Sequence, residues 1–144
     1  MQEIPEILDK LKQKLANGVS LAVEFADGAG SAEFFGSGIK PLLNAVLSAA
    51  PLLYGAVCAD KIVGKAAALL FVYAKARFVY AELISDLALK VLRFYGVSCA
   101  FAKLVPYIQN RLQTGQCPTE LLCSDTANPD EALRRLCEFM NNGS

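Results

Sequence analysis

The segment 61–75 constrains the fold of this 144-residue chain more than any other part of it. Its residues would be apolar almost all round a helix, which predicts a helix in the interior of the protein. The segment follows a short, wholly apolar run at 53–58, a pattern typical of a strand that is covered on both faces. A buried strand followed by a buried helix indicates a layered α/β fold.

The rest of the chain continues this alternation of strands and helices. The order predicts one domain over 1–144, built as a three-layer α/β/α sandwich with a mixed five-stranded sheet. Within it we expect an N-terminal helix in 1–17 and the remaining elements in 18–140. These elements are a hairpin of strands at 19–25 and 31–35, helices at 40–49 and 85–95, strands at 78–82 and 97–102, a long folded loop at 103–126 and a final helix at 129–140.

Charge and composition exclude several classes of function. Fourteen basic and fourteen acidic residues give a formal net charge of zero, which removes the main electrostatic reason to expect nucleic acid or an anionic membrane as a partner. The chain has no histidine, so a histidine general base, triad or metal ligand is excluded. The uncharged run 41–59 contains Pro51 near its middle, and we interpret it as part of the core rather than as a membrane span.

The five cysteines point to a reducing compartment. Their number is odd, no two are spaced as Cys-x-x-Cys, and no secretory signal precedes them. We therefore expect free thiols and a cytoplasmic protein. Cys58 is expected to be a buried thiol, and Cys117 is expected to be more accessible, with no role indicated.

A further signal is the string Ala-Asp-Lys-x-x-Gly-Lys-Ala at 59–66. Together with segments at 36–42, 79–85 and 105–111, it resembles a small bacterial domain family of unknown function with a cytidine-deaminase-like fold. The resemblance covers about residues 18–140 and implies that fold. Deaminases of this fold bind zinc through His-x-Glu and Pro-Cys-x-x-Cys segments.

The zinc motifs of the deaminases do not match here. By the order of elements they would fall at 37–40 and 58–61, where only Cys58 is an ordinary strong zinc ligand. The resemblance therefore implies the fold without zinc-dependent deamination, and we expect neither a metal nor a cofactor. The same stretch nearly matches a phosphate-binding loop, but Ala59 replaces the first glycine and Ala66 replaces the Mg²⁺-binding Ser or Thr.

Two lysines suggest an anion site. Lys61 and Lys65 would lie in the first turns of the predicted helix, where their charge opposes the helix dipole and Asp60 acts as the cap. A bound phosphate or carboxylate would satisfy both the lysines and the free N–H groups. The alternative is that the lysines pair with Asp60 and Glu82 or extend into solvent.

These observations lead to a hypothesis about function. The carboxyl ends of the strands should form a pocket that binds a nucleotide or another phosphorylated small molecule. One alternative is a protein-interaction or homo-oligomerisation module with a degenerate pocket, and another is a metal-independent enzyme that uses Asp60 and Glu82. No residue is assigned a catalytic role. The candidate ligand-binding residues are Ser37, Asp60, Lys61, Gly64, Lys65, Glu82, Ser85, Asn110 and Arg111.

Overall fold

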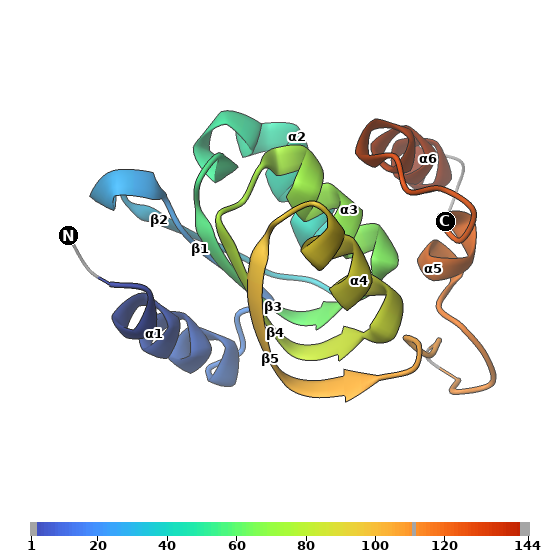
Figure 1. Ribbon diagram of the computed structural model, residues 1–144, viewed down its shortest axis with the longest axis horizontal. Helices are drawn as coiled ribbons and strands as arrows, with labels where there is room; N and C mark the ends of the chain where they lie inside the picture. The colour runs from blue at the N-terminus through green and yellow to red at the C-terminus, as the bar shows by residue number, and fades with distance from the viewer. Residues whose placement is uncertain (1–2, 111, 142–144) are drawn as a thin grey trace.

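The computed structural model describes residues 3–110 and 112–141 and is drawn in Figure 1. Strands of one mixed sheet alternate with helices along the chain. The helices are α1 (Ile4–Ala16), α2 (Lys40–Leu53), α3 (Lys65–Ala74), α4 (Asp86–Phe94), α5 (Pro118–Leu122) and α6 (Pro129–Asn141), with a 3-10 turn, η1, at Ala26–Gly28. The strands are β1 (Leu21–Glu24), β2 (Ser31–Phe34), β3 (Val57–Val63), β4 (Phe78–Ser85) and β5 (Ser98–Val105).

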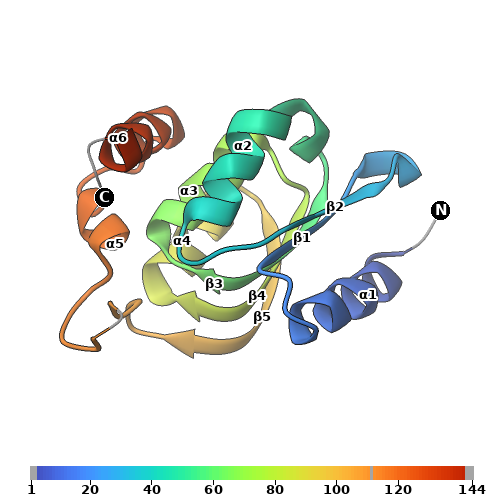
Figure 2. The same ribbon diagram turned by 180° about the vertical axis from the view of Figure 1, so that it is seen from behind.

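The five strands lie in the order β2-β1-β3-β4-β5. Strand β1 pairs antiparallel with β2 and β3, whereas β3, β4 and β5 are parallel. This confirms the α/β class and the mixed five-stranded sheet predicted from the sequence. Because α3 and α4 connect parallel strands, both helices start at the same side of the sheet, next to the carboxyl ends of β3 and β4 (Figure 2).

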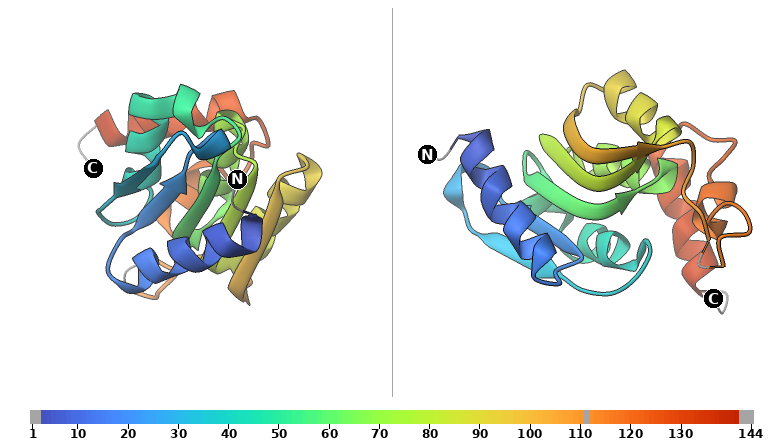
Figure 3. Two further views of the ribbon diagram at one scale, coloured as in Figure 1. Left: turned by 90° about the vertical axis from the view of Figure 1, so that its left-hand side faces the viewer. Right: turned by 90° about the horizontal axis from the view of Figure 1, so that it is seen from below.

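Helices cover both faces of the sheet (Figure 3). Helix α1 packs on one face, where its buried Leu11 and Leu15 lie in a cluster with Val57 and Ala59 of β3. The larger core lies on the other face, under α2, α3 and α4, with α6 packed against α3. Alternate residues of β3 therefore point to two different cores, as the period of a strand requires.

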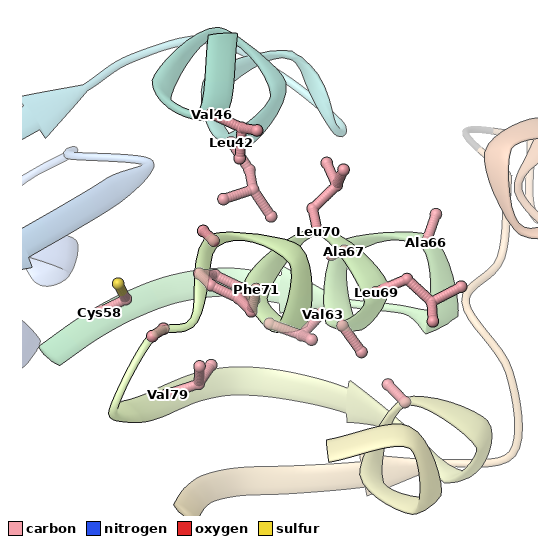
Figure 4. Close-up of a cluster of buried hydrophobic side chains, with 14 of the residues drawn as sticks. Leu42, Val46, Cys58, Val63, Ala66, Ala67, Leu69, Leu70, Phe71 and Val79 are labelled. Atoms are coloured by element: carbon pink, nitrogen blue, oxygen red, sulfur yellow. The ribbon is translucent and has the colours of Figure 1, made fainter. Parts of the chain in front are cut away.

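Helix α3 is the centre of the larger core (Figure 4). Leu69, Leu70 and Phe71 are almost completely buried, in agreement with the expected interior helix. Its start, however, differs from the prediction of a helix from residue 61. Strand β3 continues to Val63, because Ile62 and Val63 still pair with β4, and Gly64 precedes the first helical residue. Asp60 and Lys61 are therefore strand residues.

Other boundaries also differ from the sequence prediction, among them the start of β3, which lies at Val57 rather than at residue 53. Helix α2 continues to Leu53, but its backbone is interrupted at Ala49, where φ is −143°. Pro51 therefore lies in the first turn after the interruption, where the absence of a backbone N–H on proline costs no hydrogen bond. Strand β4 runs on to Ser85. The expected long loop at 103–126 is shorter, because β5 extends to Val105 by pairing with β4 and α5 forms within the rest.

Candidate functional site

The start of α3 is occupied by a carboxylate from a distant part of the chain. The backbone N–H of Lys65 donates to Oε1 of Glu120 at 2.6 Å, and the N–H of Ala66 donates to Oε2 at 3.0 Å. Glu120 belongs to α5 and is nine-tenths buried. The first N–H groups of a helix have no partner within it and carry partial positive charge, so they favour such an anion. The sequence predicted a bound ligand as the anion at a helix start here, whereas in the structure a side chain of the protein itself accepts from these N–H groups.

Gly64 makes this contact sterically feasible. A Cβ atom at position 64 would lie 2.4 Å from the Glu120 carboxyl carbon and from Oε1. The φ of Gly64 is −95°, which any residue adopts, so its importance lies in the absent side chain rather than in its backbone conformation. The carboxylate approaches the backbone at the point where a side chain is missing.

Further contacts hold the segment that carries Glu120. The Lys65 ammonium donates to the carbonyl oxygen of Ser124 at 2.9 Å. From α6, Arg135 donates to the carbonyl oxygen of Leu122 at 3.0 Å and to Asp125 at 2.5 Å. Lys65 thus takes part in fastening the segment, and its partner is different from the carboxylates proposed for it from the sequence.

Cys123 anchors the same segment in the core. Its thiol is buried beside α3 and α6, and burial raises its pKa to about 11, with a further contribution from the negative charge of Glu120. A thiol with a raised pKa is a weak nucleophile at neutral pH. Cys123 therefore acts as an apolar packing residue.

Asp60 lies in β3 on the side of Cys58, whose pKa is raised by burial and then by the charge of Asp60. The Asp60 side chain is half-buried, and the nearby backbone N–H groups of Ile62 and Lys61 favour its charged form. Burial raises the pKa of Asp60 to about 7; the two N–H groups oppose this shift, and the nearby Glu82 charge adds to it. Asp60 can therefore change its protonation state near neutral pH. Cys58 is buried, as the sequence predicted.

Glu82 lies on the neighbouring strand β4 and is also half-buried. Its charge acts on Asp60 and on Tyr80, whose pKa is raised mainly by burial and further by Glu82. The ammonium of Lys12 from α1 lies 4.8 Å from the centre of the Tyr80 ring. The charge of Glu82 thus acts on Asp60 from the adjacent strand, where Ala81 rather than Glu82 lies directly opposite Asp60.

Ser20 forms hydrogen bonds both with the loop that contains Ser37 and with the backbone of Lys61. The Ser20 hydroxyl donates to the carbonyl oxygen of Gly36 at 2.8 Å, and its backbone carbonyl accepts the N–H of Lys61 at 3.3 Å. Ser37 is the exposed residue that follows Gly36. The backbone at Gly36 is therefore linked to the backbone of Lys61 through Ser20, while Gly64 and Lys65 belong to the α3 start.

The remaining candidates have local structural roles. Ser85 is buried, and its hydroxyl accepts the N–H of Ala88 at 3.1 Å, which caps α4. Asn110 closes a turn by accepting the N–H of Thr114 at 3.1 Å and by donating its own N–H to Gly115 at 2.8 Å. Arg111 lies outside the described residues.

Comparison with known proteins places the chain in a family. A family model described as TM1506, a domain of unknown function (DUF1893), matches residues 10–140. The chain belongs to the DUF1893 family. No curated protein matches it.

A solved DUF1893 structure has the same fold. It is the crystal structure of a DUF1893 family protein, TM1506, from Thermotoga maritima, with 28% sequence identity and a TM-score of 0.85. The match covers 96% of this chain and 92% of that one. The likeness therefore extends through α5 and α6, the elements that follow the sheet.

This DUF1893 domain also has a groove that the sequence did not indicate. The groove lies between α2 and α6 and has a volume of about 260 Å³. Its walls come from segments nearly a hundred residues apart, and each contributes ordinary amphipathic helix positions, so no local pattern could have marked it. The lining residues include Lys40, Leu43, Asn44, Leu47, Cys137 and Met140.

Two further properties concern metals and membranes. Within residues 3–110 and 112–141, no cluster of three or more Cys, Asp or Glu side chains has the geometry of a metal site. None of the helices described is both long and apolar enough to cross a bilayer.

Proposed function

We propose that this DUF1893 domain binds a nucleotide or another phosphorylated small molecule at the start of α3, where Glu120 takes the place of the phosphate when the ligand is absent. The supporting observation is the pair of N–H groups on Lys65 and Ala66 that Glu120 accepts at 2.6 and 3.0 Å. Phosphate oxygens accept the same kind of hydrogen bond, and the helix dipole favours their charge. The missing side chain at Gly64 gives a ligand the same close access that the carboxylate has.

The neighbouring side chains suit the rest of such a ligand. Lys65 lies at the helix start and would offer its ammonium to a phosphate if it left Ser124. Asp60 and Glu82 carry carboxyl groups of the kind that bind sugar hydroxyls, and Lys61 follows Asp60 in β3. A ligand that extends from the α3 start toward β3 would meet acceptors for its hydroxyl groups.

The proposal includes a cytidine-deaminase-like arrangement without the zinc chemistry. At the two positions where deaminases hold zinc, this chain has Ser37 and Lys40 at the first and Cys58 and Lys61 at the second. The pKa of the Cys58 thiol is raised by burial, and lysine ammonium groups repel a cation, so this donor set does not fit zinc. Binding is therefore proposed without metal-assisted deamination.

A ligand titration tests the proposal. The melting temperature of the full chain is measured with inorganic phosphate, sugar phosphates and nucleotides for the wild type, Glu120→Ala and Lys65→Ala. Because a charge-assisted contact of about 1.5–3 kcal/mol competes with the ligand, Glu120→Ala should bind phosphate compounds about tenfold or more tightly. Lys65→Ala should bind them more weakly than the wild type.

The matched control is Glu138→Gln, an exposed carboxylate on α6 that pairs with Arg134. It should show the same ligand response as the wild type. Equal shifts of the melting temperature with phosphate compounds in the wild type and in Glu120→Ala would reject a phosphate-binding site at the start of α3.

A second candidate function is acid–base catalysis by Asp60 and Glu82. The observation in its favour is the pKa of Asp60 at about 7, because a general acid or base works best when its pKa is near the operating pH. An activity that is lost in Asp60→Asn while ligand affinity is kept would support this alternative. Strong ligand binding without turnover, unchanged in Asp60→Asn, would reject it.

A further inference from the structure

Strand β5 forms one edge of the sheet. It pairs with β4 on one side, and no strand of the described residues pairs with its outer side. Its eight residues, Ser98–Val105, form that edge of the sheet (Figure 3), and the row of backbone N–H and C=O groups on its outer side has no strand partner among the described residues. Such a row is a template for pairing with another strand.

The opposite edge of the sheet is protected in the usual ways, whereas β5 is not. Strand β2 has only four residues, and its Glu33 forms an ion pair with Lys14 at 3.3 Å. Strand β5 is twice as long, contains neither proline nor glycine, and has Lys103 as its single charged residue. Natural edges are commonly blunted by shortness, charge, proline or bulges, and β5 shows little of this.

Apolar side chains are exposed on β5 and on the helix packed against it. Phe101 is 37% and Leu104 is 44% exposed on the strand, and Leu87 and Phe94 are 44% and 80% exposed on α4. Helix α4 contacts both β4 and β5. The exposed backbone row is thus accompanied by apolar surface that a neighbouring strand and helix would bury.

We propose that β5 pairs antiparallel with β5 of a second copy of this chain, so that the two sheets join across a two-fold axis. Two copies of the strand can pair antiparallel without bringing like charges together, because the one charged residue, Lys103, lies off centre and the other residues are uncharged. The formal net charge of zero means that two copies do not repel one another at long range. A two-fold contact also places α4 of each copy near the junction, and closed two-fold dimers are the commonest oligomers.

The sequence of β5 restricts the register of this pairing. A two-fold axis perpendicular to the sheet places one residue opposite its own copy. With Phe101 on the axis, two aromatic rings pair and Lys103 faces Cys99, whereas an axis at Lys103 would bring two ammonium groups together. A register centred on Phe101 is therefore favoured over one centred on Lys103.

Light scattering on the full chain at micromolar concentrations tests the pairing. The wild type should have twice the mass of the 15.5 kDa chain. Ala102→Lys adds a charge at an exposed position next to Lys103 and should halve the measured mass. The control Ser31→Lys adds the same charge to the β2 edge and should leave the dimer intact.

Hydrogen exchange on the wild type gives a readout that does not depend on how a variant folds. Backbone amides in 98–105 should become more protected as protein concentration rises, while those in 31–34 should not change. A wild type with the mass of one chain at every concentration would overturn the proposal. A dimer that persists in folded Ala102→Lys, or one that forms without added protection of the amides in 98–105, would do so as well.

Discussion

Gly64 and Glu120 are in such close contact that a Cβ atom on Gly64 would lie 2.4 Å from the carboxyl carbon of Glu120. The two residues are 56 positions apart in the sequence, and the carboxylate binds the N–H groups that directly follow the glycine. This contact closes the start of the central helix. The Glu120 carboxylate also supplies the negative charge that favours a helix start, because the first turn of α3 contains no acidic residue of its own.

Substitution of Gly64 by alanine should therefore destabilise the protein through Glu120. The added methyl group forces the carboxylate away from Lys65 and Ala66, and overpacking of this kind costs about 1–3 kcal/mol in the free energy of unfolding. The same substitution in a Glu120→Ala background should cost much less. Urea denaturation of the four proteins in this double-mutant cycle measures the difference, and equal costs in the two backgrounds would show that the two residues do not interact.

Replacement of Glu120 by glutamine should lower stability although the shape is kept. Glutamine retains one acceptor oxygen but points an NH₂ group at the second backbone N–H, and it loses the negative charge at the helix start. We expect a loss of about 1–3 kcal/mol in the free energy of unfolding. The control Glu138→Gln removes an exposed surface pair and should stay within about 0.5 kcal/mol of the wild type; a similar loss in both variants would contradict the special role of Glu120.

The pH dependence of stability should carry the signature of Asp60. Burial raises the pKa of Asp60 to about 7 in the folded protein, compared with about 3.9 in an unfolded chain. The folded state therefore binds more protons between these two values, so the contribution of Asp60 to stability is greatest below about pH 4 and falls as the pH rises to 7. Above about pH 8 it should be constant.

The variant Asp60→Asn isolates this contribution, because asparagine has almost the same shape and does not titrate. Melting temperatures of both proteins between pH 4 and 9 should show the wild type losing stability relative to the variant as the pH rises. Parallel profiles of the two proteins would mean that Asp60 titrates in the folded protein as it does in the unfolded chain.

Ser85 should contribute stability through α4 rather than through a ligand. Its buried hydroxyl accepts the N–H of Ala88, and loss of such a cap costs about 1 kcal/mol. In a chain of this size Ser85→Ala should lower the melting temperature by about 2–5 °C. Ser31→Ala, on the exposed edge strand β2, serves as the control and should leave the melting temperature within about 1 °C of the wild type. If Ser85→Ala instead kept the melting temperature of the wild type but lost its shift with phosphate compounds, Ser85 would belong to the binding site.

The sequence predicted the candidate site only in part. Asp60 and Glu82 were expected to line one pocket; the charge of Glu82 acts on Asp60, but Ala81 is the residue opposite Asp60 in β4, and the shared pocket stays a prediction. Lys61 was expected on the first turn of a helix but lies in β3, because the pairing of Ile62 and Val63 with β4 extends the strand. A helix start and a strand end have similar local sequences here, and only the neighbouring strand decides between them.

The sequence by itself determined the class of fold and the buried position of the central helix. These follow from the spacing of apolar residues, which is a local property of a chain that must bury them. It also predicted, as one of two alternatives, an anion at a helix start carrying Lys61 and Lys65, because the unpaired N–H groups of a helix start need a partner and both features are local. Which anion satisfies that need was decided by tertiary structure alone. Glu120 reaches Lys65 only because the chain turns back after β5 and because Arg135 and Cys123 hold the segment against α3 and α6, contacts between residues whose proximity no local pattern records.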